Sequence, residues 1–420
     1  MIIRIDNATI LDSHSSFHNQ KKNLIIEDGI IKNISDNQEK ADTVIQGNNL
    51  MVSPGWVDMR VTIGDPGLEH KEDIKSISTA AAFGGFTEIL CMPGTKPAIH
   101  TKDVIGYIKG KAREELVDIH LAACVTHDRL GKDMTEMIDL HHAGALAFTD
   151  GDKPIWHTDI LLKSLQYLQT FDGLLIDHAE ELTLTHSGQM NEGINSTRLG
   201  LKGIPKLSED IIVERNLNIL SYSGGRIHFA HISSPQSIEK IRKAKQAGLK
   251  VTCDIAAYNL VLDDSLLHTF DTGYKVNPPL RDREDVNYFW RALEEGVIDV
   301  IVSDHVPLDE ESKNTEFDLA EFGMIGIETV FPILLLHEHN KLKMDVLLEK
   351  LCYNPRKILK LPVPVVKEGE LANLTIFDPS HRWTYHAKDV KSKSKNSPFI
   401  GNEFTGKVIA VFNKGKFKVN

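Results

Sequence analysis

The sequence lacks the features that mark several classes of protein. It has four cysteines among 420 residues, and none of them forms a C-x-x-C pair. This argues against a disulfide framework and against a thiolate zinc site. No apolar run reaches the roughly 18 residues that a membrane helix needs, and the first residues lack the basic and apolar segments of a secretory signal. We therefore expect a cytoplasmic protein with no membrane partner.

Basic residues are fewer than acidic residues, since the chain has 48 Lys and Arg and 59 Asp and Glu, which gives a net charge of −11. Binding to nucleic acid requires a basic surface that neutralises phosphates, so we expect no nucleic-acid partner. The Lys-rich segment 388–397 is interpreted as a solvated loop. With 41% hydrophobic and 25% charged residues, the composition is that of an ordinary folded protein with a sizeable core.

Eight short apolar runs with helical patterns between them begin at residue 56. Segment 71–85 has such a helical pattern closed by Gly84 and Gly85, and segment 234–248 opens with a serine and is closed by Gly248. Alternating strands and helices of this kind predict an α/β fold with a parallel sheet, and eight of them predict a TIM-like (β/α)8 barrel. The runs are WVDMRV, TEILCM, DIHLAACV, ALAFT, GLLID, RIHFA, KVTCDI and VIDVIVS.

The two ends of the chain have a different pattern. Both contain short alternating segments joined by Asp-Gly and Lys-Gly turns, which are typical of antiparallel strands. Neither end is large enough to bury a good core alone. We therefore predict that residues 1–52 and 365–420 combine into a small β-sandwich domain beside a barrel of residues 53–364.

Polar residues follow the predicted strands at the end where barrel enzymes hold their reacting groups. His178, His231 and Asp304 are of particular interest, because imidazole and carboxylate can hold a zinc ion that acidifies a bound water. Hydrogen-bonded rim histidines without a metal are the alternative. His228 lies on the opposite face of its strand by alternation. The full set of strand-end residues is Arg60, Thr62, Gly94, Asp150, Asp152, His178, His231, Tyr258, Asn259, Asp304 and His305.

Many ordered segments of the chain resemble the dihydroorotases that are related to allantoinases and hydantoinases. The resemblance implies a metal-bearing barrel with a small β-sandwich, and the reversible ring closure of N-carbamoyl-aspartate to dihydroorotate on one or two zinc ions. The matching segments include SPGWVDMRV, GGFTEILCMPGTKP, GALAFTD, DHAEE, GQMNEG, LGLKGIP, HISSPQSIEKIRKAKQAGLKVTCDI, KVNPPLR, VSDHVP, GIET, NPRKIL and SKSKNSPFIG.

The chain departs from this family pattern at the positions that carry chemistry. The first family strand ends D-x-H-x-H-x-R-x-P-G, where the histidines bind metal and the arginine binds substrate; here Arg60, Thr62 and Gly64 take those places. Gly94 stands for a substrate-binding asparagine, and Leu308 for a histidine of the last loop. The resemblance leaves a partial metal set of His178, His231, Asp304 and either Asp150 or Asp152, with Asn277 as a substrate contact.

Two hypotheses follow from these replacements. Arg60 cannot coordinate zinc, so it would repel a metal or pair with Asp304. The first hypothesis is a catalytically defective family member that serves as a structural or regulatory subunit, forms a homo-oligomer and assembles with aspartate carbamoyltransferase. The second is an enzyme with one ion at His178, His231 and Asp150 or Asp152, in which Asp304 is the general base and another cyclic amide or N-acyl compound is the substrate. Either no zinc or one ion is expected, and weak dihydroorotase activity is ranked third.

Overall fold

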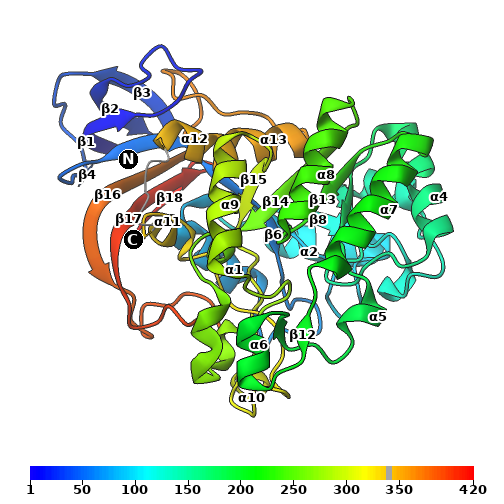
Figure 1. The fold of residues 1–420 in the computed structure, drawn as a ribbon. Coiled ribbons are helices and arrows are strands. Elements are labelled where there is room, and N and C mark those ends of the chain that lie inside the picture. The colour runs from blue at the N-terminus through cyan, green and yellow to red at the C-terminus, as the bar shows by residue number, and fades with distance from the viewer. Residues whose placement is uncertain (337–342) are drawn as a thin grey trace.

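A computed structural model describes residues 1–336 and 343–420. Its centre is a parallel eight-stranded sheet that contains one strand in each predicted apolar run, which confirms the predicted barrel (Figure 1). The sheet closes where Thr62 donates its backbone N–H to the carbonyl of His305 at 2.9 Å. In hydrogen-bonding order the strands are β6 (Trp56–Val61), β7 (Phe86–Cys91), β8 (Asp118–Ala123), β9 (Ala145–Phe148), β10 (Leu175–Asp177), β13 (Ile227–Phe229), β14 (Val251–Ala256) and β15 (Val300–Val302).

Helices connect and cover these strands. The predicted helix in segment 71–85 is α1 (Ile74–Gly84), which is capped by Asp73 at its start and by Gly85 at its end, where the φ of 97° favours glycine. The predicted helix in segment 234–248 is α8 (Pro235–Gln246). The other helices are α2 (Lys102–Ala112), α3 (Met137–Ala143), α4 (Thr158–Leu168), α5 (Leu182–Thr185), α6 (Ile194–Leu199), α7 (Leu207–Ser223), α9 (Arg283–Glu294), α10 (Glu310–Lys313), α11 (Val330–Leu334), α12 (Met344–Leu348) and α13 (Asn354–Leu359).

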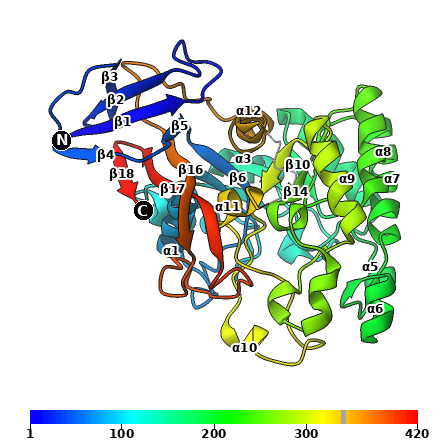
Figure 2. The same ribbon diagram turned by 60° about the vertical axis from the view of Figure 1, so that its left-hand side comes forward.

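Strands from both ends of the chain form a second sheet beside the barrel, as Figures 1 and 2 show. The two ends meet where β16 pairs antiparallel with β5. This part has a core of its own, which includes Ile5, Leu24 and Leu374. The strands are β1 (Ile2–Ile10), β2 (Lys21–Glu27), β3 (Ile30–Ser35), β4 (Thr43–Ile45), β5 (Met51–Pro54), β16 (Leu374–Thr384), β17 (Glu403–Asn413) and β18 (Lys416–Val419); β11 (Met190–Asn191) and β12 (Gly203–Ile204) form a separate pair.

The interpretation of segment 388–397 as a solvated loop is wrong for the three of its ten residues that are buried, Val390, Ser392 and Ser394. Ser392 and Ser394 are buried, whereas the intervening Lys393 and the following Lys395 are exposed. Ser392 donates its backbone N–H to Glu328 at 2.8 Å, and Ser394 donates its hydroxyl to the carbonyl of Lys71 at 2.8 Å. The two serines therefore anchor the segment to the barrel, whereas Lys393 and Lys395 remain exposed.

None of the helices in the described part of the chain combines the length and the apolar character that crossing a bilayer requires.

Candidate functional site

A cavity of about 400 Å³ lies at the carboxyl ends of the barrel strands, where the sequence placed the candidate site. It brings together most of the predicted residues and leaves out Gly64, Asp150, Asn259, His305 and Leu308. Its lining consists of Arg60, Thr62, Met92, Gly94, Arg129, Asp152, His178, His231, Tyr258, Asn277, Asp304, Val306, Glu321, Phe322 and Gly323.

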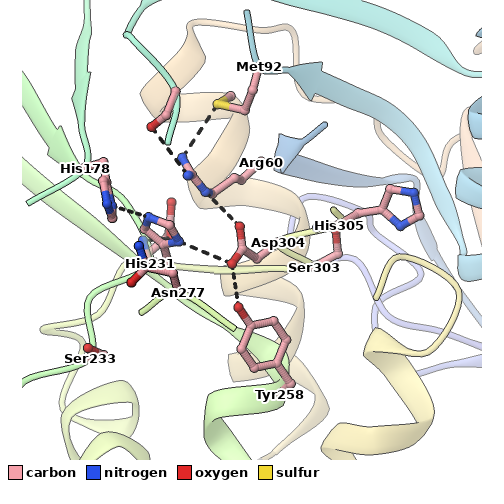
Figure 3. A network of polar contacts seen from close by, with 12 residues as sticks. Arg60, Met92, His178, His231, Ser233, Tyr258, Asn277, Ser303, Asp304 and His305 are labelled. Atoms are coloured by element: carbon pink, nitrogen blue, oxygen red, sulfur yellow. Dashed lines mark hydrogen bonds and ion pairs between the residues drawn. The ribbon is translucent and has the colours of Figure 1, made fainter. Parts of the chain in front are cut away.

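Arg60 and Asp304 form a buried ion pair on the cavity wall (Figure 3). Nε of Arg60, from β6, donates to Oδ1 of Asp304 at 2.8 Å, and the two side chains are only 7% and 4% exposed. The rest of the guanidinium contacts the sulfur of Met92 at 3.7 Å and the carbonyl of Gly151 at 3.5 Å. The pairing expected for Arg60 is therefore present, and it uses a carboxylate that the second hypothesis needs as a base.

The same carboxylate is held as an anion by its other neighbours. Burial alone would raise the pKa of Asp304, but the hydrogen bond with His231 and the charge of Arg60 hold that pKa well below its usual range. Tyr258, on the turn after β14, donates its hydroxyl to Oδ2 of Asp304 at 2.5 Å. Asp304 is thus a weak proton acceptor, because every one of these contacts favours its ionised form.

His178 and His231 lie at the ends of β10 and β13 and are hydrogen-bonded to each other. Nδ1 of His178 is 2.8 Å from Nε2 of His231, whose Nδ1 is 3.2 Å from Oδ2 of Asp304. Nε2 of His178 is 2.8 Å from Oε2 of Glu180, to which Asn277 also donates its amide at 3.2 Å. All four ring nitrogens are therefore engaged by protein groups.

His231 is uncharged near neutral pH. Burial, with a further contribution from the charge of Arg60, lowers the pKa of His231 to about 4. His231 and Asp304 also have the unusual positive φ values of 38° and 46°. Such backbone conformations cost about 1–3 kcal/mol each in non-glycine residues and are concentrated at functional sites.

The two aspartates around Gly151 point in different directions. Asp150 accepts the backbone N–H groups of Val125 and Thr126, both at 3.0 Å, and the Thr126 hydroxyl. Its prediction as a metal ligand is therefore not supported by the geometry, because its oxygens are used by the loop after β8. Asp152 does line the cavity, but its largely exposed carboxylate pairs with Arg129.

Three of the replaced positions have identifiable surroundings. Gly64 is enclosed, because a Cβ atom there would lie 2.1 Å from the carbonyl oxygen of Leu68. A Cβ at Gly94 would lie 3.2 Å from Nη1 of Arg129. Leu308 lines a separate cavity beside the Lys-rich segment. Neither Gly64 nor Leu308 contributes a side chain to the candidate site.

The two other strand-end candidates and His228 lie away from the cavity. Nε2 of His305 is 3.3 Å from Glu72, and its ring points away from the Asp304 carboxylate in Figure 3. Asn259 is buried, and its amide has no hydrogen-bond partner among the described residues. His228 is hydrogen-bonded to Thr252 and, at 2.8 Å, to Asp254. None of them contributes to the cavity wall.

Comparison with known proteins identifies the family. The family model "Dihydro-orotase-like" matches residues 49–237, and the model "Amidohydrolase family" matches residues 201–418. The chain is 39% identical to a dihydroorotase of Geotalea daltonii over 99% of both chains, and 40% identical to one of Acetivibrio thermocellus over 92% and 91%. This chain belongs to the dihydroorotase family.

Solved structures of hydantoinases share the fold. An L-hydantoinase (dihydropyrimidinase) from Arthrobacter aurescens matches with a TM-score of 0.84 and 25% identity, covering 100% of this chain and 97% of that one. A D-hydantoinase from Thermus sp. matches with a TM-score of 0.81 at 21% identity, covering 100% and 95%. The second likeness concerns the fold alone.

The residues of this dihydroorotase-family chain do not fit a zinc ion in the arrangement described. Proteins of the family generally bind zinc, but within the described residues no three His, Cys, Asp or Glu side chains are placed to hold a metal together. The guanidinium of Arg60 brings a permanent positive charge to Asp304, and each histidine nitrogen already has a protein partner. A metal would have to break these contacts.

Sequence reasoning missed two residues of this family site. Glu180 holds His178 and Asn277, and its place two residues after His178 is a signal that could have identified it. Arg129 lies on the loop after β8, the one predicted strand that supplied no strand-end candidate. Its place just beyond a barrel strand is the signal that could have identified it.

Proposed function

We propose that this chain is a dihydroorotase-family protein of pyrimidine biosynthesis that has lost the family reaction and serves as a structural or regulatory subunit. The observation that carries the proposal is the buried Arg60–Asp304 ion pair. A guanidinium stays protonated at any physiological pH, so it cannot be a metal ligand and it repels a divalent cation. The cavity wall thus carries the permanent positive charge of Arg60 in the place of an exchangeable metal ion.

Three further observations support the loss of chemistry. The two histidines are satisfied by each other, by Glu180 and by Asp304. Asp150 is held by backbone amides of a neighbouring loop. At Gly64 the Leu68 carbonyl leaves no space for a side chain, so an arginine could be restored there only by moving the loop.

The first test is the zinc content of protein purified without chelator, together with assays of the dihydroorotate reaction in both directions. We expect substoichiometric zinc and no turnover, while the Geotalea daltonii relative, assayed in parallel, serves as the positive control. The variant Arg60→Met tests the effect of the cation on zinc binding, because it removes the guanidinium and keeps His178, His231 and Asp304. One tightly held zinc per wild-type chain with turnover of dihydroorotate would contradict the proposal.

The subunit role needs a separate test, for which aspartate carbamoyltransferase of the same organism is the partner. The proposal expects a homo-oligomer and a joint complex when the two purified proteins are mixed and analysed by size-exclusion chromatography with light scattering. Elution of the chain as a monomer that never shifts with the transferase would refute this role.

A second candidate function is a single-metal amidohydrolase that acts on a different cyclic amide or N-acyl compound. It is favoured by one observation, namely that His178, His231 and Asp304 line one cavity. Zinc reconstitution followed by a screen of hydantoins and N-acyl amino acids tests it, with His178→Gln and His231→Gln as matched variants. Hydrolysis that needs both histidines would establish this function in place of the first.

A further inference from the structure

Arg129 enters the cavity from a loop with an unusual backbone. The loop follows β8, and Asp128 and Arg129 have φ values of 52° and 57°. Neither residue is a glycine, so each conformation costs about 1–3 kcal/mol that the surrounding structure must offset. Glycine occupies two positions beside the guanidinium: a Cβ atom would lie 3.2 Å from Nη1 at Gly94 and 3.3 Å from it at Gly151. Side chains are thus absent where they would crowd Arg129.

Only one nitrogen of this guanidinium, Nη1, donates hydrogen bonds to the described residues. Nη1 donates to the carboxylate of Asp152 and, at 3.5 Å, to the carbonyl of Asp150. Nε and Nη2 have no hydrogen-bond partner among the described residues. The Arg129 side chain is 17% exposed, whereas that of Asp152 is 73% exposed, so water competes strongly for this partner. The Nε and Nη2 edge is the planar fork that pairs with a carboxylate through two parallel hydrogen bonds.

We propose that the cavity binds a small organic acid without turning it over, and that the carboxylate of the acid pairs with the Nε and Nη2 edge of Arg129. The inference rests on the proposed function, because it assigns a ligand to a cavity that has lost its reaction. It makes the site a sensor of that ligand, which is one way in which a subunit can regulate a partner.

The charges around the cavity favour a monoanion over phosphate. Arg60 is neutralised by Asp304, and Glu321 at the rim pairs with Lys71 at 3.2 Å. With those charges paired, a doubly charged phosphate would meet only the free edge of Arg129, and its second negative charge would lie beside Asp152 with no cation to balance it. A planar carboxylate of single charge matches that edge in both shape and charge.

Two further polar groups define the rest of the ligand. The hydroxyl of Thr62 and Oδ1 of Asn277 belong to cavity-lining residues and have no hydrogen-bond partner among the described residues. Oδ1 of Asn277 can only accept a hydrogen bond, and the hydroxyl can accept or donate one. An acid that also carries an amide N–H fits these acceptors, and the volume of about 400 Å³ limits it to a small molecule.

The test compares succinamate, which has one carboxylate and one amide, with succinamide, which has two amides and no charge. Binding to the full chain is measured by calorimetry in the presence of chelator, so that no metal contributes. We expect a Kd of about 1 mM for succinamate, at least about tenfold weaker binding to Arg129→Gln, and no binding of succinamide.

Two variants control for charge and folding. Arg113→Gln removes an exposed arginine at the end of α2 and should bind succinamate as the wild type does. Arg129→Lys keeps the charge but lacks the fork, so it should bind more weakly than the wild type and more tightly than Arg129→Gln. No binding of succinamate up to about 20 mM, or equal binding by wild type and Arg129→Gln, would overturn the inference. Turnover of dihydroorotate would overturn the proposed function, whereas the pairing of a carboxylate with Arg129 is decided separately by the binding of succinamate, which involves no turnover.

Discussion

At the scale of single residues, Arg60 and Asp304 should contribute to the free energy of unfolding as a coupled pair rather than independently. Removing one partner leaves a buried charge, so Arg60→Met is expected to lower the free energy of unfolding by about 3 kcal/mol. In the double variant Arg60→Met/Asp304→Asn both charges are gone, and the loss should be smaller than the sum of the single losses by about 2 kcal/mol. Urea denaturation of the four proteins measures this coupling energy.

A surface pair provides the comparison. Arg242 lies 2.6 Å from Glu295, and both side chains are partly exposed. The same cycle with Arg242→Met and Glu295→Gln should give a coupling energy below about 1 kcal/mol. Additive losses at Arg60 and Asp304 would show that the buried pair does not act as a unit.

His231 should make the stability of the protein depend on pH in a defined direction. Burial lowers its pKa to about 4, whereas the ordinary value is 6.5. Between these values the unfolded chain binds a proton that the folded protein does not, so the contribution of His231 to stability falls as the pH falls through that window. The loss is on the order of 2 kcal/mol between about pH 7 and pH 4.5.

The measurement must be a difference between variants, because Asp58 acts in the opposite direction. Burial raises the pKa of Asp58 to about 7, so its folded carboxyl keeps a proton that the unfolded chain has lost, and stability rises as the pH falls. That effect is common to both proteins when wild type is compared with His231→Gln. His268→Gln, at an exposed position, should leave the slope unchanged. A wild-type curve parallel to that of His231→Gln would refute the lowered pKa.

At the scale of elements, the loops after β8 and β9 are joined through Asp150. Asp150→Ala leaves two buried backbone N–H groups without an acceptor, so we expect it to reduce the free energy of unfolding by about 3 kcal/mol. Asp152→Ala, at an exposed carboxylate, should cost less than about 1 kcal/mol. Chemical denaturation with parallel zinc analysis checks both variants. A stable Asp150→Ala protein that has lost bound zinc would instead make Asp150 a metal ligand.

Elements could be predicted from the sequence better than side-chain directions. Apolar runs with helical patterns between them mark all eight barrel strands, and Gly85 marks the end of α1, because burial and backbone conformation limit which residues those positions accept. The sequence also indicated that His178 and His231 lie at strand ends. It could not show that they bond to each other, since that depends on the rotation of each ring.

Asp150 and Arg129 illustrate the same limit within loops. The position of Asp150 after a strand was predicted, but its side chain turns to the amides of a neighbouring loop, a contact between segments that no local pattern encodes. The entry of Arg129 into the cavity depends on positive φ values at two residues that are not glycine. Such conformations are imposed by the surrounding structure and carry no compositional signal.

At the scale of the whole molecule, the terminal sheet has its own core but also contributes side chains to the hydrophobic core of the barrel. Phe377 of β16 packs against Trp56 of the first barrel strand, with 5.4 Å between ring centroids, and Phe331 of α11 contacts both. The boundary predicted between residues 53–364 and the ends of the chain therefore crosses a packed interface. Two parts that share their core cannot expose it separately at low cost.

We therefore expect the sheet and the barrel to unfold in one cooperative transition. Phe377→Ala should lower the free energy of unfolding by about 3–5 kcal/mol while the transition stays single, because the cavity it leaves lies in the shared core. Phe417→Ala, in the partly buried terminal strand β18, should cost less and serves as the control. Coincident denaturation curves from far-ultraviolet circular dichroism and tryptophan fluorescence would support this cooperativity. Two separated transitions in the wild type, with Phe377→Ala shifting only one of them, would show that the composite domain folds independently of the barrel.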